Sequence, residues 1–349
     1  MAKVGGPVRD IAVDLGTSLS LASVRGRGIV VREPSVLAVD RHTGEALCAG
    51  EEALRLLGRT PGEVLAVRPL EAGVLRDGAL AEVLLRNLMQ KAAPGRVFKP
   101  RLLLSVPTGA APVDERALVD AGLRAGARKV FLMEGPLAAA LGAGLDPEAP
   151  GGHLVADVGG GTADIAVVAL GGVVTAACPP ASGDDFDRAL LRYIREEHGV
   201  LAGRRAAEAV KRAAGQVSAA GEETGEPFPV KGKCLTTGLP REVLMTPAET
   251  ARALAPVAEE LVRGVLEVLE RTPRSLLADI AAEGILLTGG GSLLRRLDRL
   301  LSERTGFPVV RPEDPEGAVA LGLEKSLAGL SRRRDGVLDQ AGRRTISEK

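Results

Sequence analysis

The stretch His153–Leu170, HLVADVGGGTADIAVVAL, constrains the fold of this chain more than any other. It predicts an apolar strand that ends in Asp157, a three-glycine turn and a second, β-branched strand, Ile165–Val168. Glycine lets a backbone approach a ligand closely, and successive amide groups in such a turn can form an anion site. A carboxylate at the strand end suits a hydrated Mg²⁺ that bridges to phosphate. The alternative is a tight hairpin whose Asp and Gly serve only the turn.

The same pattern occurs near the N-terminus and again near the C-terminal end. A strand, Ile11–Val13, runs into Asp14-Leu-Gly-Thr17, and Ser20–Val24 resumes an extended pattern. A third strand, Ile285–Thr288, leads into three glycines and is expected to open a helix from about Leu293, which would make another electropositive site. The repeat of strand, Asp and glycine turn predicts two related halves that face each other across a cleft, each with a phosphate-binding hairpin.

Length and composition exclude several classes of protein. With 349 residues the chain has room for about two domains, and 45% hydrophobic and 26% charged residues are typical of a globular protein. Lys+Arg and Asp+Glu both number 45, and aromatic residues make up 2%, so neither a basic field nor stacking platforms indicate nucleic-acid binding.

Scattered cysteines and histidines indicate neither a zinc site nor a disulfide framework. Cys48, Cys178 and Cys234 form no CxxC pair, and the three histidines are equally dispersed. No run approaches the roughly 18 apolar residues of a spanning helix, and the N-terminus lacks a signal core. We therefore expect a cytoplasmic protein.

Strands and helices alternate at a pace that predicts an α/β fold. Leu102–Val106 is followed by a predicted helix, Asp114–Ala125, then a strand, Val130–Met133, and an Ala-rich helix to about Leu145. Smaller modules are expected at about 30–66 and 219–247. A long amphipathic helix is expected at Pro247–Glu270, a last helix at Gly317–Leu330, and a mostly disordered, Arg-rich tail after it.

Two local features leave alternatives open. Val97 and Phe98 lie on a predicted loop between Arg96 and Lys99, so this pair could fold back onto the core or anchor the protein in lipid beside anionic head groups. Glu208 and Lys211, three residues apart on a predicted helix, share a face and could simply form a surface ion pair.

The three glycine turns, taken in order, resemble the two phosphate motifs and the adenosine motif of the actin-like ATPase superfamily. A narrower similarity is carried by GIVVREPSVLAVD, GEEALRLLGRTPGEVLAVRPLEAGV, AGARKVFLMEGPLAAALGAGL and EGILLTGGGSLLRRLDRLLSERTGFPV. These segments are similar to the MreB family of bacterial cell-shape filament proteins, and the resemblance runs from about residue 9 to residue 328.

The resemblance implies an α/β, actin-like (ribonuclease H-like) fold with two lobes, each built of a large and a small subdomain. The first large subdomain would comprise residues 1–32, 67–146 and 316–330, and the first small one residues 33–66. The second lobe would comprise a large subdomain of residues 147–182 and 246–315 and a small one of residues 183–245. Residues 331–349 would form the basic tail.

ATP and Mg²⁺ are the implied cofactors. Asp14 and Asp157 would hold metal-bound waters, with Asp157 and Glu134 as the candidate catalytic residues. Glu208 and Lys211 match the family's Glu-x-x-Lys that contacts ribose and adenine, and this match favours a nucleotide contact over a surface ion pair. The remaining nucleotide-binding positions implied by the resemblance lie in the three turns: Gly16, Thr17, Ser18, Gly159, Gly160, Gly161, Thr162, Gly289, Gly290 and Gly291.

Two departures from the family pattern bear on hydrolysis. The chain has Glu134-Gly135-Pro136 where members usually carry Glu-Glu-Pro, and the residue before the proline is the one thought to position the attacking water. Glycine has no side chain to orient water, and the loss of such a group can cost about 10²–10⁴-fold in rate. Arg204 also replaces a usual acid before the nucleotide-binding helix. We expect a weak ATPase at most.

The implied function is a homopolymer filament at the inner face of the cytoplasmic membrane that works with cell-wall morphogenesis proteins to organise peptidoglycan synthesis and cell shape. Val97 and Phe98 match the family's membrane loop, which favours the anchor over the folded-back loop. Two alternatives stay open: a nucleotide-binding scaffold that does not hydrolyse ATP, and a small-molecule kinase of the same fold. Nucleic acid is not an expected partner.

Overall fold

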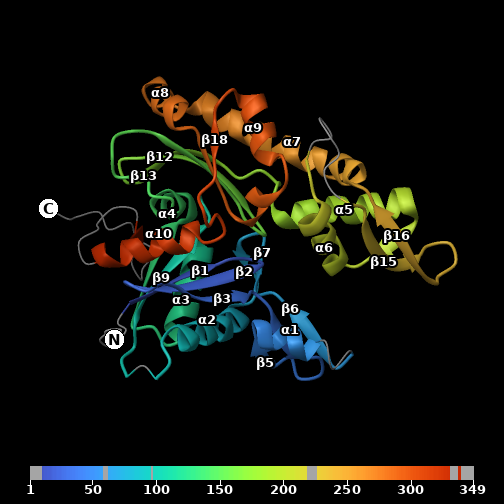
Figure 1. The fold of residues 1–349 in the computed structure, drawn as a ribbon. Helices are drawn as coiled ribbons and strands as arrows, with labels where there is room; N and C mark the ends of the chain where they lie inside the picture. The colour runs from blue at the N-terminus through green and yellow to red at the C-terminus, as the bar shows by residue number, and fades with distance from the viewer. Residues whose placement is uncertain (1–9, 58–61, 96, 218–225, 331–336, 339–349) are drawn as a thin grey trace, which may run out of the picture. The chain divides into compact units, whose positions relative to one another are not determined.

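The computed structural model describes residues 10–57, 62–95, 97–217, 226–330 and 337–338. The chain divides into two compact units (Figure 1). Unit 1 comprises residues 1–152, 168–174 and 316–349, and unit 2 comprises residues 153–167 and 175–315. The predicted division into four subdomains stays a prediction.

A six-stranded sheet forms the centre of unit 1, in the order β19-β10-β9-β1-β2-β3. Its strands are β1 (Asp10–Leu15), β2 (Leu19–Val24), β3 (Gly28–Pro34), β9 (Arg101–Val106), β10 (Lys129–Glu134) and β19 (Val337–Leu338). β1 pairs in parallel with β9 and antiparallel with β2, so the Asp14 turn closes a hairpin. β19 lies within the predicted tail, the rest of which is outside the described residues.

Helices cover both faces of this sheet (Figure 1). α2 (Gly78–Ala92) and α3 (Pro112–Arg124) lie on one face, where Leu84, Leu85 and Leu88 are fully buried. α4 (Gly135–Gly142) and α10 (Ala318–Ser326), with the 3₁₀ turn η2 (Leu327–Gly329), lie on the other. A Cβ atom added to Gly142 would lie 1.8 Å from the carbonyl oxygen of Ala318, so glycine is what allows α4 and α10 to approach so closely.

A small module extends the chain between β3 and α2. Its sheet, in the order β5-β4-β6, consists of β4 (Leu37–Asp40), β5 (Ala46–Ala49) and β6 (Val64–Val67), with α1 (Glu51–Leu57) packed against it. The hairpin β7 (Leu70–Glu71) and β8 (Val74–Leu75) follows.

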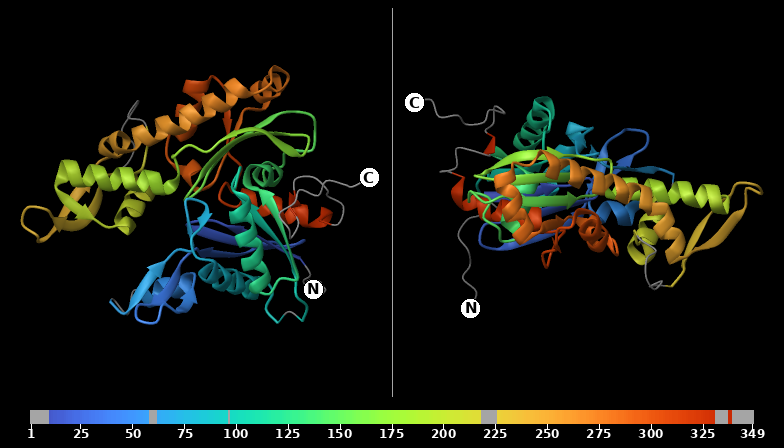
Figure 2. Two further views of the ribbon diagram at one scale, coloured as in Figure 1. Left: turned by 180° about the vertical axis from the view of Figure 1, so that it is seen from behind. Right: turned by 90° about the horizontal axis from the view of Figure 1, so that it is seen from above.

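A five-stranded sheet in the order β13-β12-β11-β17-β18 is the counterpart of the first sheet. Most of it belongs to unit 2, whereas the end of β12 and the start of β13, within residues 168–174, are assigned to unit 1. It consists of β11 (His153–Val158), β12 (Ala163–Ala169), β13 (Gly172–Ala177), β17 (Ile285–Thr288) and β18 (Val309–Val310). The long helix α7 (Pro247–Arg271) lies across this sheet (Figure 2), and its Leu261 and Val265 are fully buried. α8 (Arg274–Glu283) and α9 (Leu297–Thr305) complete this layer.

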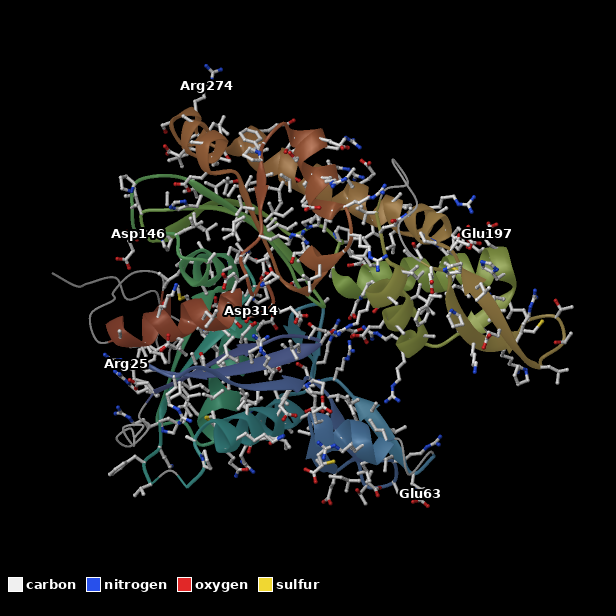
Figure 3. The ribbon with its side chains drawn as sticks, viewed as in Figure 1. Arg25, Glu63, Asp146, Glu197, Arg274 and Asp314 are labelled. Carbon is white, nitrogen blue, oxygen red and sulfur yellow. The ribbon has the colours of Figure 1, made fainter. Side chains whose placement is uncertain are left out.

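A second small module contains a three-stranded sheet in the order β14-β15-β16, built of β14 (Val200–Ala202), β15 (Phe228–Cys234) and β16 (Pro240–Met245). α5 (Gly183–His198) and α6 (Arg204–Ala214) pack against it through Phe186, Val210 and Val230, which are buried. Charged side chains such as Glu63 and Glu197 project outward from their modules (Figure 3). Among the described residues no helix is both long and apolar enough to cross a membrane.

Candidate functional site

The predicted site residues fall into two groups, one in each unit. Unit 1 contains Asp14, Gly16, Thr17, Ser18 and Glu134. Unit 2 contains Asp157, the turn Gly159–Thr162, Glu208, Lys211 and the three glycines that follow β17.

Asp14 lies one residue before the end of β1 and is held by a residue that sequence reasoning missed. The hydroxyl of Ser105, on the neighbouring parallel strand β9, donates a hydrogen bond to Asp14 Oδ1 at 2.6 Å. The same hydroxyl oxygen accepts the backbone N–H of Leu15 at 3.3 Å. Burial raises the pKa of Asp14 to about 6, and the bond from Ser105 opposes that rise. Ser105 therefore fixes the carboxylate in one orientation.

The turn after Asp14 is tight. A Cβ atom on Gly16 would lie 2.4 Å from the carbonyl oxygen of Leu19, so only glycine fits. Thr17 is buried, and its hydroxyl accepts the N–H of Gly73 at 3.4 Å. The hydroxyl of Ser18 accepts a bond from the guanidinium of Arg68 at 3.3 Å. The turn is thus held in place from the β7–β8 region.

Asp157 has a position in unit 2 that is equivalent to the position of Asp14 in unit 1. It lies in β11 opposite Thr288 of the parallel strand β17, and the Thr288 hydroxyl donates to Asp157 Oδ1 at 3.0 Å. Gly289 follows with φ +79°, where a Cβ would lie 2.7 Å from the same oxygen and 2.3 Å from the Val158 carbonyl oxygen. The second and third glycine turns, Gly159–Thr162 and Gly289–Gly291, therefore both begin beside this carboxylate.

The turn Gly159–Thr162 packs against the start of α5. Gly159 N–H donates to the Thr162 carbonyl at 2.8 Å and closes the turn. The Gly159 and Gly160 carbonyls accept the N–H groups of Gly183 and Asp184 at 2.9 and 2.8 Å. Sequence reasoning also missed the contact that Gly183 makes with this turn. Because glycine has no side chain, it lets the start of α5 approach the turn closely.

Glu208 and Lys211 lie on one face of α6 but do not pair with each other in the structure. Lys211 Nζ lies 2.8 Å from both the Gly183 carbonyl oxygen and Asp187 Oδ1, so it joins α6 to the start of α5. Glu208 pairs with Arg212 at 3.4 Å. Arg204, the basic residue that departs from the family pattern, pairs with Asp184.

The third turn differs from its prediction in one respect. The prediction of a regular helix from Leu293 was wrong, because Gly290–Leu293 forms the 3₁₀ turn η1 and α9 begins only at Leu297. The backbone of Arg296 has φ +66°, in the left-handed region, and this breaks the helical path between the two.

Glu134 ends β10 and precedes α4, where Gly135 is buried. Val97 and Phe98 lie on the loop between α2 and β9 with 86% and 57% of their surface exposed. Their side chains do not fold back onto the core.

Solved structures define the class of fold. MreB5 of Spiroplasma citri bound to AMPPNP is similar to this chain with a TM-score of 0.85 and 32% identity over 92% of this chain and 96% of that one. A MamK double helical filament gives a TM-score of 0.76 at 21% identity, over 92% of this chain and 99% of that one. The fold is the actin-like fold.

Sequence comparison narrows the class to a family. The model of the MreB/Mbl protein family matches residues 8–334. The cell shape-determining protein Mbl of Bacillus cereus is 42% identical over 93% of this chain and 97% of its own length. The cell shape-determining protein MreB of Escherichia coli is 41% identical over 91% and 93%. The chain therefore belongs to the MreB/Mbl family of actin-like cell-shape proteins.

Proposed function

We propose that this chain binds Mg·ATP, polymerises into membrane-associated filaments and organises cell-wall synthesis, with slow hydrolysis of ATP. The observation that carries the nucleotide part is the repeated arrangement at Asp14 and Asp157. Each aspartate lies near the end of its strand and beside a glycine turn. Its carboxylate accepts a hydrogen bond from a hydroxyl on the neighbouring parallel strand. The MreB5 neighbours are bound to AMPPNP and to ADP, which supports a nucleotide ligand here.

Each carboxylate has the chemistry to hold a hydrated Mg²⁺, because hard divalent cations prefer oxygen ligands and its Oδ1 is already oriented by a hydroxyl donor. When bound, the ion would neutralise charge on the phosphates. The turns at Gly16–Ser18 and Gly159–Thr162 supply amides for phosphate oxygens. Glu208, Lys211 and Gly289–Gly291 are the proposed nucleoside contacts, with Lys211 positioned by its bonds to α5.

Slow turnover is proposed from Gly135. Glu134 remains the candidate acid beside it, but a glycine before Pro136 offers no group that orients or accepts a proton from water. Gly135 also favours the alternative of a nucleotide-binding scaffold that never hydrolyses ATP. Phosphate release by the purified chain should be far slower than that of the Escherichia coli relative, and Gly135→Glu should raise it. Release at the relative's rate by the unaltered chain would contradict the proposal.

The membrane part is proposed from the exposed Val97–Phe98 pair and the basic groups beside it. The backbone N–H of Arg128 donates to the Pro100 carbonyl at 2.9 Å, so the loop before β10 lies next to the loop that carries Val97 and Phe98. Lys99, Arg128 and Lys129 are all exposed. An apolar tip with cations around it suits an anionic lipid surface.

Sedimentation with vesicles of phosphatidylglycerol tests this part. Val97→Ser with Phe98→Ser should abolish co-sedimentation while filaments still form with ATP in electron micrographs. The matched control is Leu47→Ser with Leu65→Ser, two exposed leucines of the small module in unit 1, which should still sediment with vesicles. Vesicle binding that survives the Val97/Phe98 change would refute this anchor, and a chain that never forms filaments would favour the kinase alternative.

A further inference from the structure

The start of α5 holds the second glycine turn, Gly159–Thr162, from one side. The Gly159 carbonyl oxygen accepts the backbone N–H of Gly183 at 2.9 Å. The Gly160 carbonyl oxygen accepts the backbone N–H of Asp184 at 2.8 Å. Both N–H groups belong to the first turn of α5, where the helix itself supplies no acceptor. The turn and the helix therefore satisfy each other's backbone groups.

These bonds set the direction of two amide groups in the turn. In a planar trans peptide, a C=O group and the N–H group that follows it point in opposite directions. Because the Gly159 and Gly160 carbonyl groups point toward α5, the N–H groups of Gly160 and Gly161 point away from it. Both are among the amides proposed above as donors to phosphate, so the start of α5 orients them before any ligand arrives.

Lys211 of α6 contacts the same residue of α5 that orients the turn. Its Nζ lies 2.8 Å from the Gly183 carbonyl oxygen and 2.8 Å from Asp187 Oδ1. The side chains of Lys211 and Asp187 have 16% and 6% of their surface exposed, so the pair is largely shielded from water. An ammonium group has three N–H donors, and contacts with α5 engage two of those of Lys211.

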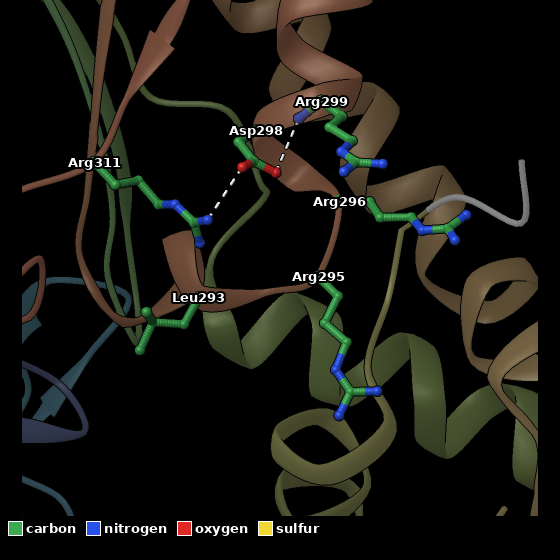
Figure 4. A pocket seen from close by; sticks show the side chains of 6 residues that line it. All are labelled: Leu293, Arg295, Arg296, Asp298, Arg299 and Arg311. Atoms are coloured by element: carbon green, nitrogen blue, oxygen red, sulfur yellow. Dashed lines mark hydrogen bonds and ion pairs between the residues drawn. The ribbon is translucent and has the colours of Figure 1, made fainter. Parts of the chain in front are cut away.

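The C-terminal end of α6 is held by a second contact. Arg295, which follows the third glycine turn, donates to the Ala213 carbonyl at 2.7 Å. Arg311 and Asp298 pair at 3.1 Å beside the same loop (Figure 4). Lys211 therefore reaches α5 from a helix whose other end is fixed to a separate part of unit 2.

We propose that Lys211 has a second role, as a positioning residue for the phosphate turn that acts through Gly183. The role rests on the proposed function, in which Lys211 is a nucleoside contact, and adds a link from the nucleoside side of the site to the phosphate side. A lysine that served only the nucleoside would not affect a ligand that has no nucleoside. A lysine that also holds Gly183 affects phosphate binding even when base and ribose are absent.

Inorganic tripolyphosphate with Mg²⁺ is the probe, and calorimetry on the full chain measures its binding beside that of Mg·ADP. Lys211→Met with Asp187→Asn removes both charges of the pair, so it leaves no unpaired buried charge and does not change the net charge. This variant should bind tripolyphosphate at least about tenfold more weakly than the unaltered chain, from which Mg·ADP should displace it. The matched control, Lys231→Met with Glu242→Gln, removes an exposed ion pair of the same module and should leave the affinity unchanged.

Two further variants separate positioning from folding and from charge. Lys211→Arg keeps a cation with several donors and should retain most of the tripolyphosphate affinity that the double variant loses. Gly183→Ala changes no charge, but its Cβ would lie 3.3 Å from the Gly159 carbonyl oxygen, so it presses on the turn and should weaken tripolyphosphate binding too. Gly203→Ala, with no atom within 4 Å of its Cβ, is the control for that change.

The outcomes distinguish this role from the proposed function. If the double variant or Gly183→Ala binds tripolyphosphate as tightly as the unaltered chain does, the positioning role is overturned and the proposed nucleotide site stands. If the unaltered chain binds Mg·ADP but not tripolyphosphate, the role is overturned as well, because the turn is then not set before the nucleoside binds. If the unaltered chain binds neither ligand, the proposed nucleotide site fails and the role fails with it.

Discussion

Asp14 should make the folded protein less stable as the pH rises. Its pKa is 3.8 in an unperturbed carboxyl and about 6 in the structure, because burial disfavours the charged form. The folded state therefore holds a proton that the unfolded state has already released between these two values. Stability falls as the pH rises from about 3.8 to 6, and the whole cost is present above that range.

The size of this cost follows from the shift. A difference of about 2 pKa units corresponds to about 3 kcal/mol at neutral pH, and about 2 kcal/mol of it should appear between roughly pH 4.5 and pH 7.5. Asp14→Asn removes the charge and keeps the shape. The variant should therefore gain stability over the unaltered chain by about 2 kcal/mol more at the higher pH than at the lower one.

Urea unfolding of the nucleotide-free chain at the two pH values measures the difference. The matched control is Asp120→Asn, an exposed carboxyl on α3, which should show no such dependence on pH. If the gain from Asp14→Asn is the same at both values, burial of this carboxylate does not govern its charge and the reasoning fails.

Three further changes test the packing around the site. Ser105→Ala removes the donor to Asp14 and should move the fall in stability to higher pH in the same titration, because that hydrogen bond lowers the pKa of Asp14; an unmoved midpoint would contradict this. Gly142→Ala should lower the free energy of unfolding by about 3 kcal/mol although alanine favours helix, since its Cβ would lie 1.8 Å from the Ala318 carbonyl oxygen; Gly172→Ala, with no atom within 4 Å of its Cβ, is the neutral control. Thr288→Val should cost about 1–3 kcal/mol by removing a buried donor to Asp157, and Thr288→Ser should recover most of it.

Much of the fold could be predicted because the strands and glycine turns are local patterns. The predicted strand Ile11–Val13 is β1, the predicted helix Asp114–Ala125 is α3, and Pro247–Glu270 is α7 within one residue. Short elements without periodicity were missed, among them β14 and β18. α8 was missed too, although Leu276, Leu277 and Ile280 have the spacing of one helix face; of its ten residues only Ile280 is buried.

The contacts of the site were harder to foresee than its turns. Lys211 and Glu208 sit three residues apart as predicted, yet each pairs elsewhere, because α5 places Asp187 and the Gly183 carbonyl closer to the ammonium group. The break before α9 depends on the left-handed conformation of Arg296, which the residue type argues against. For Lys211 the packing of a second element decides the outcome, and for α9 the local backbone conformation does.

One device in the site could have been found from sequence. Asp14 and Asp157 each accept a hydrogen bond from a hydroxyl on the neighbouring parallel strand, at 2.6 and 3.0 Å. The two donors end similar apolar runs, Leu-Leu-Leu-Ser105 and Ile-Leu-Leu-Thr288. A fully buried strand has a continuous apolar run, so a hydroxyl at its end belongs to the sheet edge where the loops begin. Parallel pairing then sets that hydroxyl opposite the aspartate, as the register of β11 with β17 shows. The repeat that first indicated two related halves thus extends beyond the glycine turns: each unit carries an aspartate together with the hydroxyl that orients it.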